Sequence, residues 1–335
     1  MSATLAILLF CAGLLLSLMA SVVLSERLDQ VGHRFRLPPG LIGLVTALGA
    51  DSPEISSAAA AIIGGQHDLG RGVIFGSNIF NVAMLLGLSA VVAGRVAMSR
   101  ANLGFNAGVA LCLTLVVGAQ MLGWAGRTVT GLLLLALIIP YGVLLSLRRG
   151  TVRSLRLPQV VRHWIERMVL AEARESAEEE VELDRLTFAD GLSIVPLLAM
   201  IIIASVAMVR AAEMLGQRWG VSQLVIGTFV VASLTGLPNL VASVRLARQG
   251  RGTALSSEAF NSNSLNLLAG AYLPTLFVSL PGPSAEAVLA LCTLLALTAA
   301  SAGIGIVGRG FGRGTGVLLV AAYAAYAAAA LWLAG

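Results

Sequence analysis

Long apolar stretches follow one another along the whole chain, separated in most places by short polar connections. Most stretches hold about 20 residues, the length that an α-helix needs to cross the hydrocarbon core of a bilayer. Because backbone polar groups in lipid must be satisfied within the protein, we expect an all-α bundle. The pattern predicts ten membrane-spanning helices, over residues 3–24, 40–63, 72–94, 104–122, 128–147, 190–212, 221–244, 255–277, 285–307 and 315–334.

One longer polar connection, residues 148–189, divides the chain into two halves, residues 1–147 and 190–335. The connection begins basic and ends acidic, and apolar residues between these ends recur at helical spacing, which predicts an amphipathic helix on the membrane surface. Its acidic run Glu178–Glu180 is either a solvated linker, which we favour, or a regulatory cation site. Five spans on each side of the connection give two halves of opposite orientation.

Composition supports a membrane protein and fixes an expected orientation. The chain is 57% hydrophobic and 12% charged, which excludes an ordinary soluble domain. All 22 basic residues are arginine, and 18 of them lie in connections that follow odd-numbered spans. The positive-inside rule therefore predicts a protein of the cell (inner) membrane with both termini outside and the central connection in the cytoplasm. The net charge of +5 thus reflects topology, and no nucleic-acid partner is expected.

A short motif occurs twice, with every position of the second copy 185 residues after the first. Pro53-Glu54 is followed by Ser77-Asn78 and Asn81, and Pro238-Asn239 is followed by Ser262-Asn263 and Asn266. Proline cannot donate a backbone hydrogen bond, so the second and seventh spans are predicted to be broken helices. Paired broken helices with polar residues at membrane depth are typical of the ion site of a transporter.

Only the first copy carries acids at its break, Asp51 and Glu54. Three residues apart on a helix, they point the same way. In a soluble protein they would more simply start a helix, with Asp51 or Ser52 as the cap. Here they lie inside an apolar span, where an unpaired carboxylate costs several kcal/mol, so a cation site is favoured.

The asparagine-rich segments offer neutral oxygen atoms. Ser77 and Asn81 are four residues apart and share one helix face. Alone they would suit hydrogen bonds between helices, but their repetition in the segment Asn261–Asn266 favours two halves of an oxygen cage. Such a cage suits a hard cation such as Ca²⁺ rather than a soft metal.

Glu258 leaves two interpretations open. It precedes Ser262 by four residues and Asn266 by eight, so it lies on their helix face. It is either a third carboxylate near the cytoplasmic mouth of the cage or a solvated residue at the start of the helix.

These motifs resemble the calcium/cation antiporter superfamily, most closely the bacterial and archaeal sodium/calcium exchangers, over essentially the whole chain. The family pattern is G-T-S-x-P-E followed by G-S-N-x-x-N or G-S-N-x-x-D. The resemblance implies two inverted-topology repeats of five helices, and alternating access in which the first and sixth spans slide past a central core. Together, the repeated motif and the resemblance give these candidate ligands besides Glu258: Asp51, Glu54, Ser77, Asn78, Asn81, Thr235, Asn239, Ser262, Asn263 and Asn266.

The chain departs from the pattern at the two breaks. Ala50-Asp51 replaces the Thr-Ser that precedes the first proline, and Asn239 stands where the second glutamate is expected. Asn266 likewise replaces the acid that often ends the second repeat. Two carboxylates from one half still neutralise one divalent cation, so Asp51 is expected to replace the missing glutamate.

Three functions compete. The leading expectation is a Na⁺/Ca²⁺ antiporter that acts as a monomer in the bilayer, needs no cofactor and is not an enzyme. The first alternative is H⁺/Ca²⁺ antiport, with a proton held between the two close carboxylates Asp51 and Glu54. The second is a membrane sensor or scaffold whose second site has decayed, although the retained Ser262, Asn263 and Asn266 argue against decay.

Overall fold

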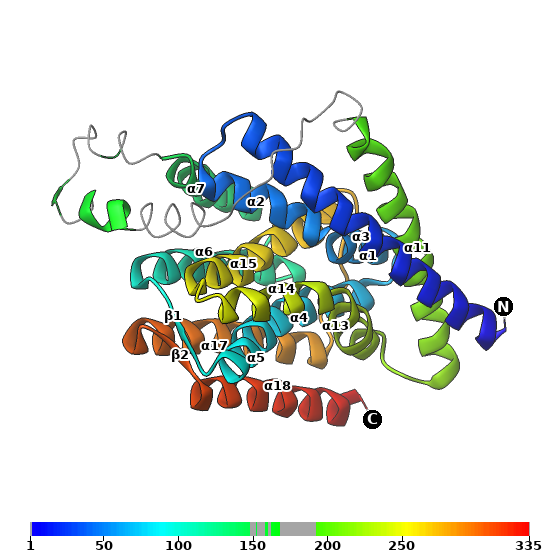
Figure 1. Cartoon of the computed structure of the whole chain (residues 1–335). Coiled ribbons are helices and arrows are strands. Elements are labelled where there is room, and N and C mark those ends of the chain that lie inside the picture. The colour runs from blue at the N-terminus through cyan, green and yellow to red at the C-terminus, as the bar shows by residue number, and fades with distance from the viewer. Residues whose placement is uncertain (1, 148–151, 153–157, 160–161, 168–191, 335) are drawn as a thin grey trace.

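The computed structural model describes residues 2–147, 152, 158–159, 162–167 and 192–334. These residues form a helical bundle in which both chain ends lie at one end of the molecule, on the right in Figure 1. The first half contains α1 (Ala3–Arg34), α2 (Pro39–Ala50), α3 (Ser52–Ile63), α4 (His67–Phe80), the π-helical turn η1 (Asn81–Leu85), α5 (Leu86–Ala93), α6 (Arg100–Met121) and α7 (Arg127–Leu145).

The second half has a similar order, with an additional π-helical turn before its break. It contains α11 (Ile194–Trp219), α12 (Gln223–Val225), η2 (Ile226–Val231), α13 (Ala232–Thr235), α14 (Leu237–Arg248), α15 (Gly252–Leu265), η3 (Asn266–Tyr272), α16 (Leu273–Thr275), α17 (Ala285–Gly308) and α18 (Arg313–Ala334). Serine side chains cap several long helices: Ser2, for example, accepts a hydrogen bond from the backbone N–H of Leu5 at the start of α1.

Seven of the described helices are long and apolar enough to cross a membrane, and the bent pair formed by residues 223–235 and 237–248 makes eight. The chain is therefore a multi-pass membrane protein with a broken span. The two further spans expected from the sequence correspond to α2–α3 and to α15–η3–α16. The first consists of two helices of 12 residues each, and α15 is rich in serine and asparagine, so neither has the form of a simple apolar span.

Both expected breaks are present. α2 ends at Ala50 and α3 begins at Ser52, with Asp51 between them and Pro53 in the first turn of α3. In the second half, α13 ends at Thr235 and α14 begins at Leu237, and the axis bends by 50° at this break. Proline is tolerated in a first turn because its missing N–H has no partner there in any helix.

A short antiparallel β-ribbon is the one departure from an all-helical chain among the described residues. β1 (Arg95–Ala97) follows α5 and pairs with β2 (Gly310–Gly312), which follows α17, with Val96 opposite Phe311. The ribbon lies at the end of the bundle opposite the two chain termini (Figure 1). It ties together the exits of two helices that are far apart in sequence.

Glycine allows the helices that carry the site to come into backbone contact. A methyl group on Gly227 of η2 would overlap the carbonyl oxygen of Leu69 in α4, and one on Gly72 would overlap the carbonyl oxygen of Leu224. The two segments thus pack without intervening side chains, as is common where membrane helices meet at small residues. This contact joins the first half to the second.

In the connection between the halves, the described residues 162–167 are helical. Trp164 packs edge-to-face on Phe105 of α6, with ring centroids 5.8 Å apart, and Ile165 is buried. This part of the expected amphipathic helix therefore contacts the bundle itself. The remainder of that helix and the acidic run Glu178–Glu180 lie outside the described residues.

Candidate cation-binding site

The two breaks occupy equivalent positions in the two halves. Asp51 lies between α2 and α3, and Gly236, 185 residues later, lies between α13 and α14. Glu54 and Asn239 then fall in the first turns of α3 and α14, and both are buried. A carboxylate at a helix start is favoured by the helix dipole. The first break therefore presents two acids where the second presents an amide and no side chain.

The two asparagine-rich segments meet in a reciprocal contact. The Nδ2 of Asn78 donates to the backbone carbonyl of Asn263 at 3.2 Å, and the Nδ2 of Asn263 donates to the carbonyl of Asn78 at 3.2 Å. Asn81 adds a hydrogen bond of 3.1 Å from its Nδ2 to the Oδ1 of Asn263. Because Asn78 and Asn263 are equivalent in the repeat, this contact has local two-fold symmetry.

Each acid of the first half accepts a hydrogen bond from an asparagine of the second half. The Nδ2 of Asn239 lies 2.8 Å from the Oδ1 of Asp51, and the Ser262 side chain lies beside the same carboxylate. The Nδ2 of Asn266 lies 3.1 Å from the Oε2 of Glu54. The same Asn266 nitrogen is 3.3 Å from the Oγ of Ser77 and 3.2 Å from the Oδ1 of Asn78.

Four buried oxygen atoms at this centre have no hydrogen-bond partner among the described residues. They belong to two carboxylates and two amides: Asp51 Oδ2, Glu54 Oε1, Asn81 Oδ1 and Asn266 Oδ1. An unsatisfied buried acceptor is costly, and a buried carboxylate more so. A hard cation relieves this cost by accepting carboxylate and amide oxygens as ligands.

Thr235 and Ser77 are buried beside these groups, but their hydroxyl hydrogens are engaged elsewhere. Thr235 donates to the carbonyls of Val231 and Ala232, and Ser77 donates to the carbonyl of Ile74. Such a hydroxyl still offers lone pairs to a cation. Thr235 ends α13 directly before Gly236, so it lies at the second break.

Glu258 lies outside the hydrogen-bonded centre. Its Oε2 accepts a hydrogen bond of 3.2 Å from the Oγ of Ser243 in α14, and the residue is partly exposed. Among the described residues, no three His, Cys, Asp or Glu side chains are arranged so that they could hold a metal together. The candidate site is therefore a pair of carboxylates completed by neutral oxygens.

Sequence reasoning missed three features of this region. Ser243 was detectable only by its position four residues after Asn239. The π-helical turns that begin at Asn81 and at Asn266 have no sequence signal, although such turns are frequent at functional sites. The hydropathy pattern places Arg71 in the polar connection between the second and third spans, yet its side chain is fully buried.

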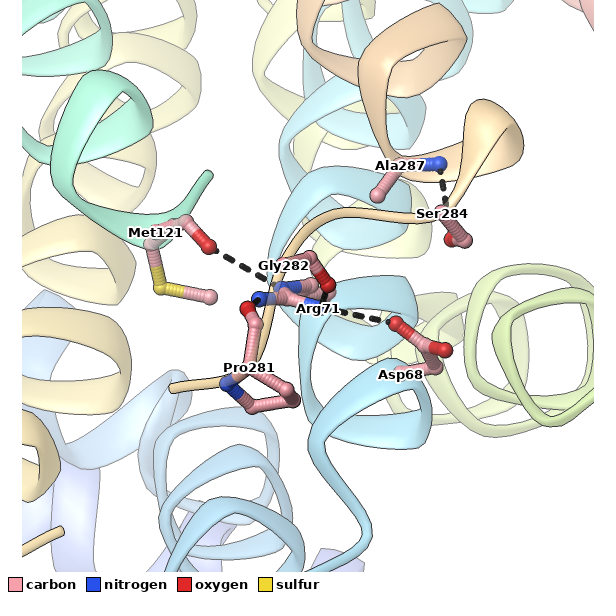
Figure 2. A network of polar contacts seen from close by, with 7 residues as sticks. All are labelled: Asp68, Arg71, Met121, Pro281, Gly282, Ser284 and Ala287. Atoms are coloured by element: carbon pink, nitrogen blue, oxygen red, sulfur yellow. Dashed lines mark hydrogen bonds and ion pairs between the residues drawn. The ribbon is translucent and has the colours of Figure 1, made fainter. Parts of the chain in front are cut away.

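Arg71 lies two turns before Ser77 on α4 and joins three segments (Figure 2). Its Nε donates to the carbonyl of Met121 at the end of α6, at 3.0 Å. One terminal nitrogen donates to Asp68 at 2.9 Å and to the Gly282 carbonyl at 3.3 Å, and the other donates to the Pro281 carbonyl at 2.5 Å. The guanidinium thus fixes the start of the helix that carries Ser77, Asn78 and Asn81.

Comparison with known proteins agrees with this architecture. The model of the family described as "Sodium/calcium exchanger protein" matches residues 5–149 and 192–332. The inner membrane protein YrbG of Escherichia coli is 27% identical over 274 residues, which cover 80% of this chain and 78% of YrbG.

Two solved structures have a similar fold. The sodium-calcium exchanger NCX_Mj superposes with a TM-score of 0.60 at 22% identity, covering 98% of this chain and 99% of its own. YfkE superposes with a TM-score of 0.59 at 16% identity, with the same coverage of both chains. With the family model matching both halves, the chain belongs to the sodium/calcium exchanger family of membrane transporters and is not an enzyme.

Proposed function

We propose that this protein is a secondary active antiporter that exchanges Ca²⁺ for Na⁺ through the site between the two breaks. The observation that carries the proposal is a set of four buried oxygens, on Asp51, Glu54, Asn81 and Asn266, that have no hydrogen-bond partner in the described part of the chain. Two carboxylates balance the charge of one Ca²⁺, and irregular oxygen cages are what Ca²⁺ accepts. The neutral oxygens of Ser77, Thr235, Ser262 and the asparagines also suit Na⁺ when Ca²⁺ has left.

The proposed ligands are the eight polar residues of the two repeats together with Asp51 and Glu54. In order along the chain they are Asp51, Glu54, Ser77, Asn78, Asn81, Thr235, Asn239, Ser262, Asn263 and Asn266. The hydrogen bonds between Asp51 and Asn239 and between Glu54 and Asn266 support this set, because they bring both halves to one centre.

The proposed architecture has ten spans in two inverted repeats, with α2–α3 and α15–η3–α16 as the second and eighth spans. In this arrangement, both termini lie outside the inner membrane and the central connection is cytoplasmic. α1 and α11 pack against each other, and α11 also contacts the first break, where Ser205 donates to the Pro53 carbonyl at 3.4 Å. Sliding of this helix pair would open the site to each side in turn, as alternating access requires. The working unit is proposed to be a monomer.

Proton coupling is the second candidate. Asp51 and Glu54 are both buried and repel each other, and a proton relieves such repulsion as a divalent cation does. Exchange of Ca²⁺ for H⁺ would use the same centre, so the coupling ion must be measured.

The decisive experiment follows Ca²⁺ uptake into proteoliposomes under two gradients applied in turn. We expect an outward Na⁺ gradient to drive uptake of radiolabelled Ca²⁺, and a pH gradient without Na⁺ to drive little. The reverse result would establish proton coupling. Absence of flux under both gradients would refute antiport and favour a sensor or scaffold.

Two substitutions link the flux to the site. Glu54→Gln is expected to abolish Ca²⁺ uptake, and Asp51→Asn to reduce it at least about a hundredfold, since each leaves one charge against a divalent cation. Glu213→Gln, in an exposed hydrogen bond with Gln217 on α11, is the matched control and should leave uptake unchanged. Near-normal uptake by Asp51→Asn would show that Asp51 is not a ligand.

A further inference from the structure

Glu258 and Ser243 form a second polar layer, one helical turn away from the cage. On α14, Ser243 follows Asn239 by four residues, and on α15, Glu258 precedes Ser262 by four residues. Four residues correspond to a rise of about 6 Å along each helix. Because α14 and α15 run in opposite directions, Ser243 and Glu258 are both displaced from the cage toward the same end of the bundle. There Ser243 donates a hydrogen bond to Glu258 at 3.2 Å.

This layer is continuous with the cage through Asp51. One turn above the layer, Asn239 donates a hydrogen bond to Asp51, and the Ser262 side chain lies beside the same carboxylate. The carboxylates of Asp51 and Glu258 are also close enough to repel each other. Asp51 is fully buried, and its Oδ2 has no hydrogen-bond partner among the described residues. Asp51 and Glu258 therefore place two negative charges in successive polar layers at this end of the cage.

Among the described residues, this polar layer has no counterpart at the equivalent positions of the first half. The positions equivalent to Ser243 and Glu258, 185 residues earlier, are Ala58 and Val73. Both are apolar and fully buried, and Val73 packs against Gly227 in the contact between α4 and η2. Glu258, by contrast, is partly exposed. The polar layer thus breaks the two-fold symmetry of the site, at the end where α14 ends and α15 begins.

We propose that Glu258 and Ser243, together with the free oxygen of Asp51, form a second cation site on the cytoplasmic access path to the cage. The ligand is a hard cation of the kind that the cage exchanges, with Ca²⁺ favoured because Glu258 and Asp51 together carry two negative charges. This inference rests on the proposed transport function and on its orientation. A cation that arrives from the cytoplasm meets Glu258 first and passes to Asp51 one turn further in.

An access site at one end predicts an effect on one side of the membrane. Without the charge of Glu258, Ca²⁺ is attracted less strongly from the cytoplasm, whereas the cage and the external path are unchanged. The apparent affinity for cytoplasmic Ca²⁺ should therefore fall, and that for external Ca²⁺ should not. If Glu258 served only as a hydrogen-bond acceptor for Ser243, its removal would not change the apparent affinity for Ca²⁺ on one side of the membrane alone.

The test compares Glu258→Gln with the wild type in inside-out and right-side-out vesicles, with Ca²⁺ as the varied ion. We expect the KM for cytoplasmic Ca²⁺ to rise about tenfold and the KM for external Ca²⁺ to change less than about twofold. Glu258→Asp should keep most of the cytoplasmic affinity, and Ser243→Ala should lose part of it. Glu26→Gln removes an exposed carboxylate near the end of α1 and is the control for a general change in surface charge.

Equal KM values for the wild type and Glu258→Gln on both faces would overturn the proposal, as would an equal rise with Glu26→Gln. If Glu258→Gln does not fold, Ser243→Ala gives the comparison, and a cytoplasmic KM that this variant leaves unchanged would overturn the proposal in the same way. An inactive wild type would instead reject the proposed function itself, and the access site with it. The two failures are therefore distinguishable.

Discussion

At the scale of single residues, both carboxylates of the site, Asp51 and Glu54, come from the first half of the chain. Asp51 is equivalent to Gly236, and Glu54 is equivalent to Asn239. The Nδ2 of Asn239 lies 2.8 Å from the Oδ1 of Asp51. The extra acid of the first half therefore lies beside the position at which the second half lacks one. This contact is expected if the carboxylate at position 51 replaces the one missing at position 239.

Two substitutions can move the carboxylate from position 51 back to position 239. Like Asp51→Asn, Asp51→Ser should reduce Ca²⁺ uptake at least about a hundredfold, because it removes the same charge. Adding Asn239→Glu should restore most of the uptake, because two neighbouring positions that exchange one charge are strongly coupled. Asn239→Glu alone should impair uptake, since it places a third carboxylate against Asp51 and Glu54. The measurement is the initial rate of Ca²⁺ uptake in proteoliposomes.

Asn239→Gln in the Asp51→Ser background is the matched control, because it adds the same length without the charge. Equal uptake by the Gln and Glu double variants would show that the charge at position 239 does not matter.

At the scale of helices, the site depends on two segments that glycine and arginine hold in place. Gly72 and Gly227 let α4 and η2 touch through their backbones. Arg71 then fixes the start of α4 to the end of α6 and to residues 281–282 (Figure 2). Helix termini carry unpaired carbonyl groups, and a cation near the carbonyl end of a helix is favoured. Arg71 is thus a positioning residue for the helix that carries Ser77 and Asn81.

Arg71→Met should lower the Tm of the purified protein clearly. The substitution leaves the buried Met121 carbonyl without its donor, and a buried unpaired group of this kind costs about 1–3 kcal/mol. Arg127→Met is the control, because Arg127 bonds to Ser279 and to the Leu276 carbonyl in exposed positions. A similar Tm for the two variants would mean that the Arg71 network contributes little to stability.

At the scale of the whole molecule, contacts between distant segments restrict how the chain crosses the membrane. The β1–β2 ribbon places residues 95–97 and 310–312 together at one end, so an even number of crossings separates them. Arg71 likewise holds the start of α4 beside residues 281–282. The proposed ten-span arrangement has six spans between the two strands, which is an even number. In the proposed arrangement, the described arginine-rich connections at residues 95–100, 245–251 and 309–313 lie at the end that carries the ribbon.

The proposed orientation can be tested by labelling single cysteines in a variant in which Cys11, Cys112 and Cys292 are alanine. Ser2→Cys should react with a membrane-impermeant maleimide added to intact cells, because both termini are expected outside. Arg248→Cys, at the end of α14, should react only after the membrane is permeabilised. The opposite labelling pattern would invert the topology and move the access site of Glu258 to the external face.

The sequence by itself determined the membrane class, both helix breaks and the repeated set of oxygen donors. These features are local: hydropathy follows from a run of about 20 residues, and proline interrupts the helix in which it stands. The break that Pro53 predicts is found at Asp51, and the break that Pro238 predicts is found at Gly236. The two spans that depart from a simple apolar helix, α2–α3 and α15–η3–α16, are those that carry Asp51, Glu54 and the second asparagine segment.

Only the tertiary structure decided which donors meet. Three contacts depend on how closely the helices approach each other. They are the hydrogen bond from Asn239 to Asp51, the reciprocal pair between Asn78 and Asn263, and the hydrogen bond from Ser243 to Glu258. The same holds for the burial of Arg71, whose carbonyl partners come from other helix ends and connections. Helical periodicity gives the face on which a side chain lies but not the neighbour across the interface, because that neighbour is set by backbone packing at residues such as Gly72 and Gly227.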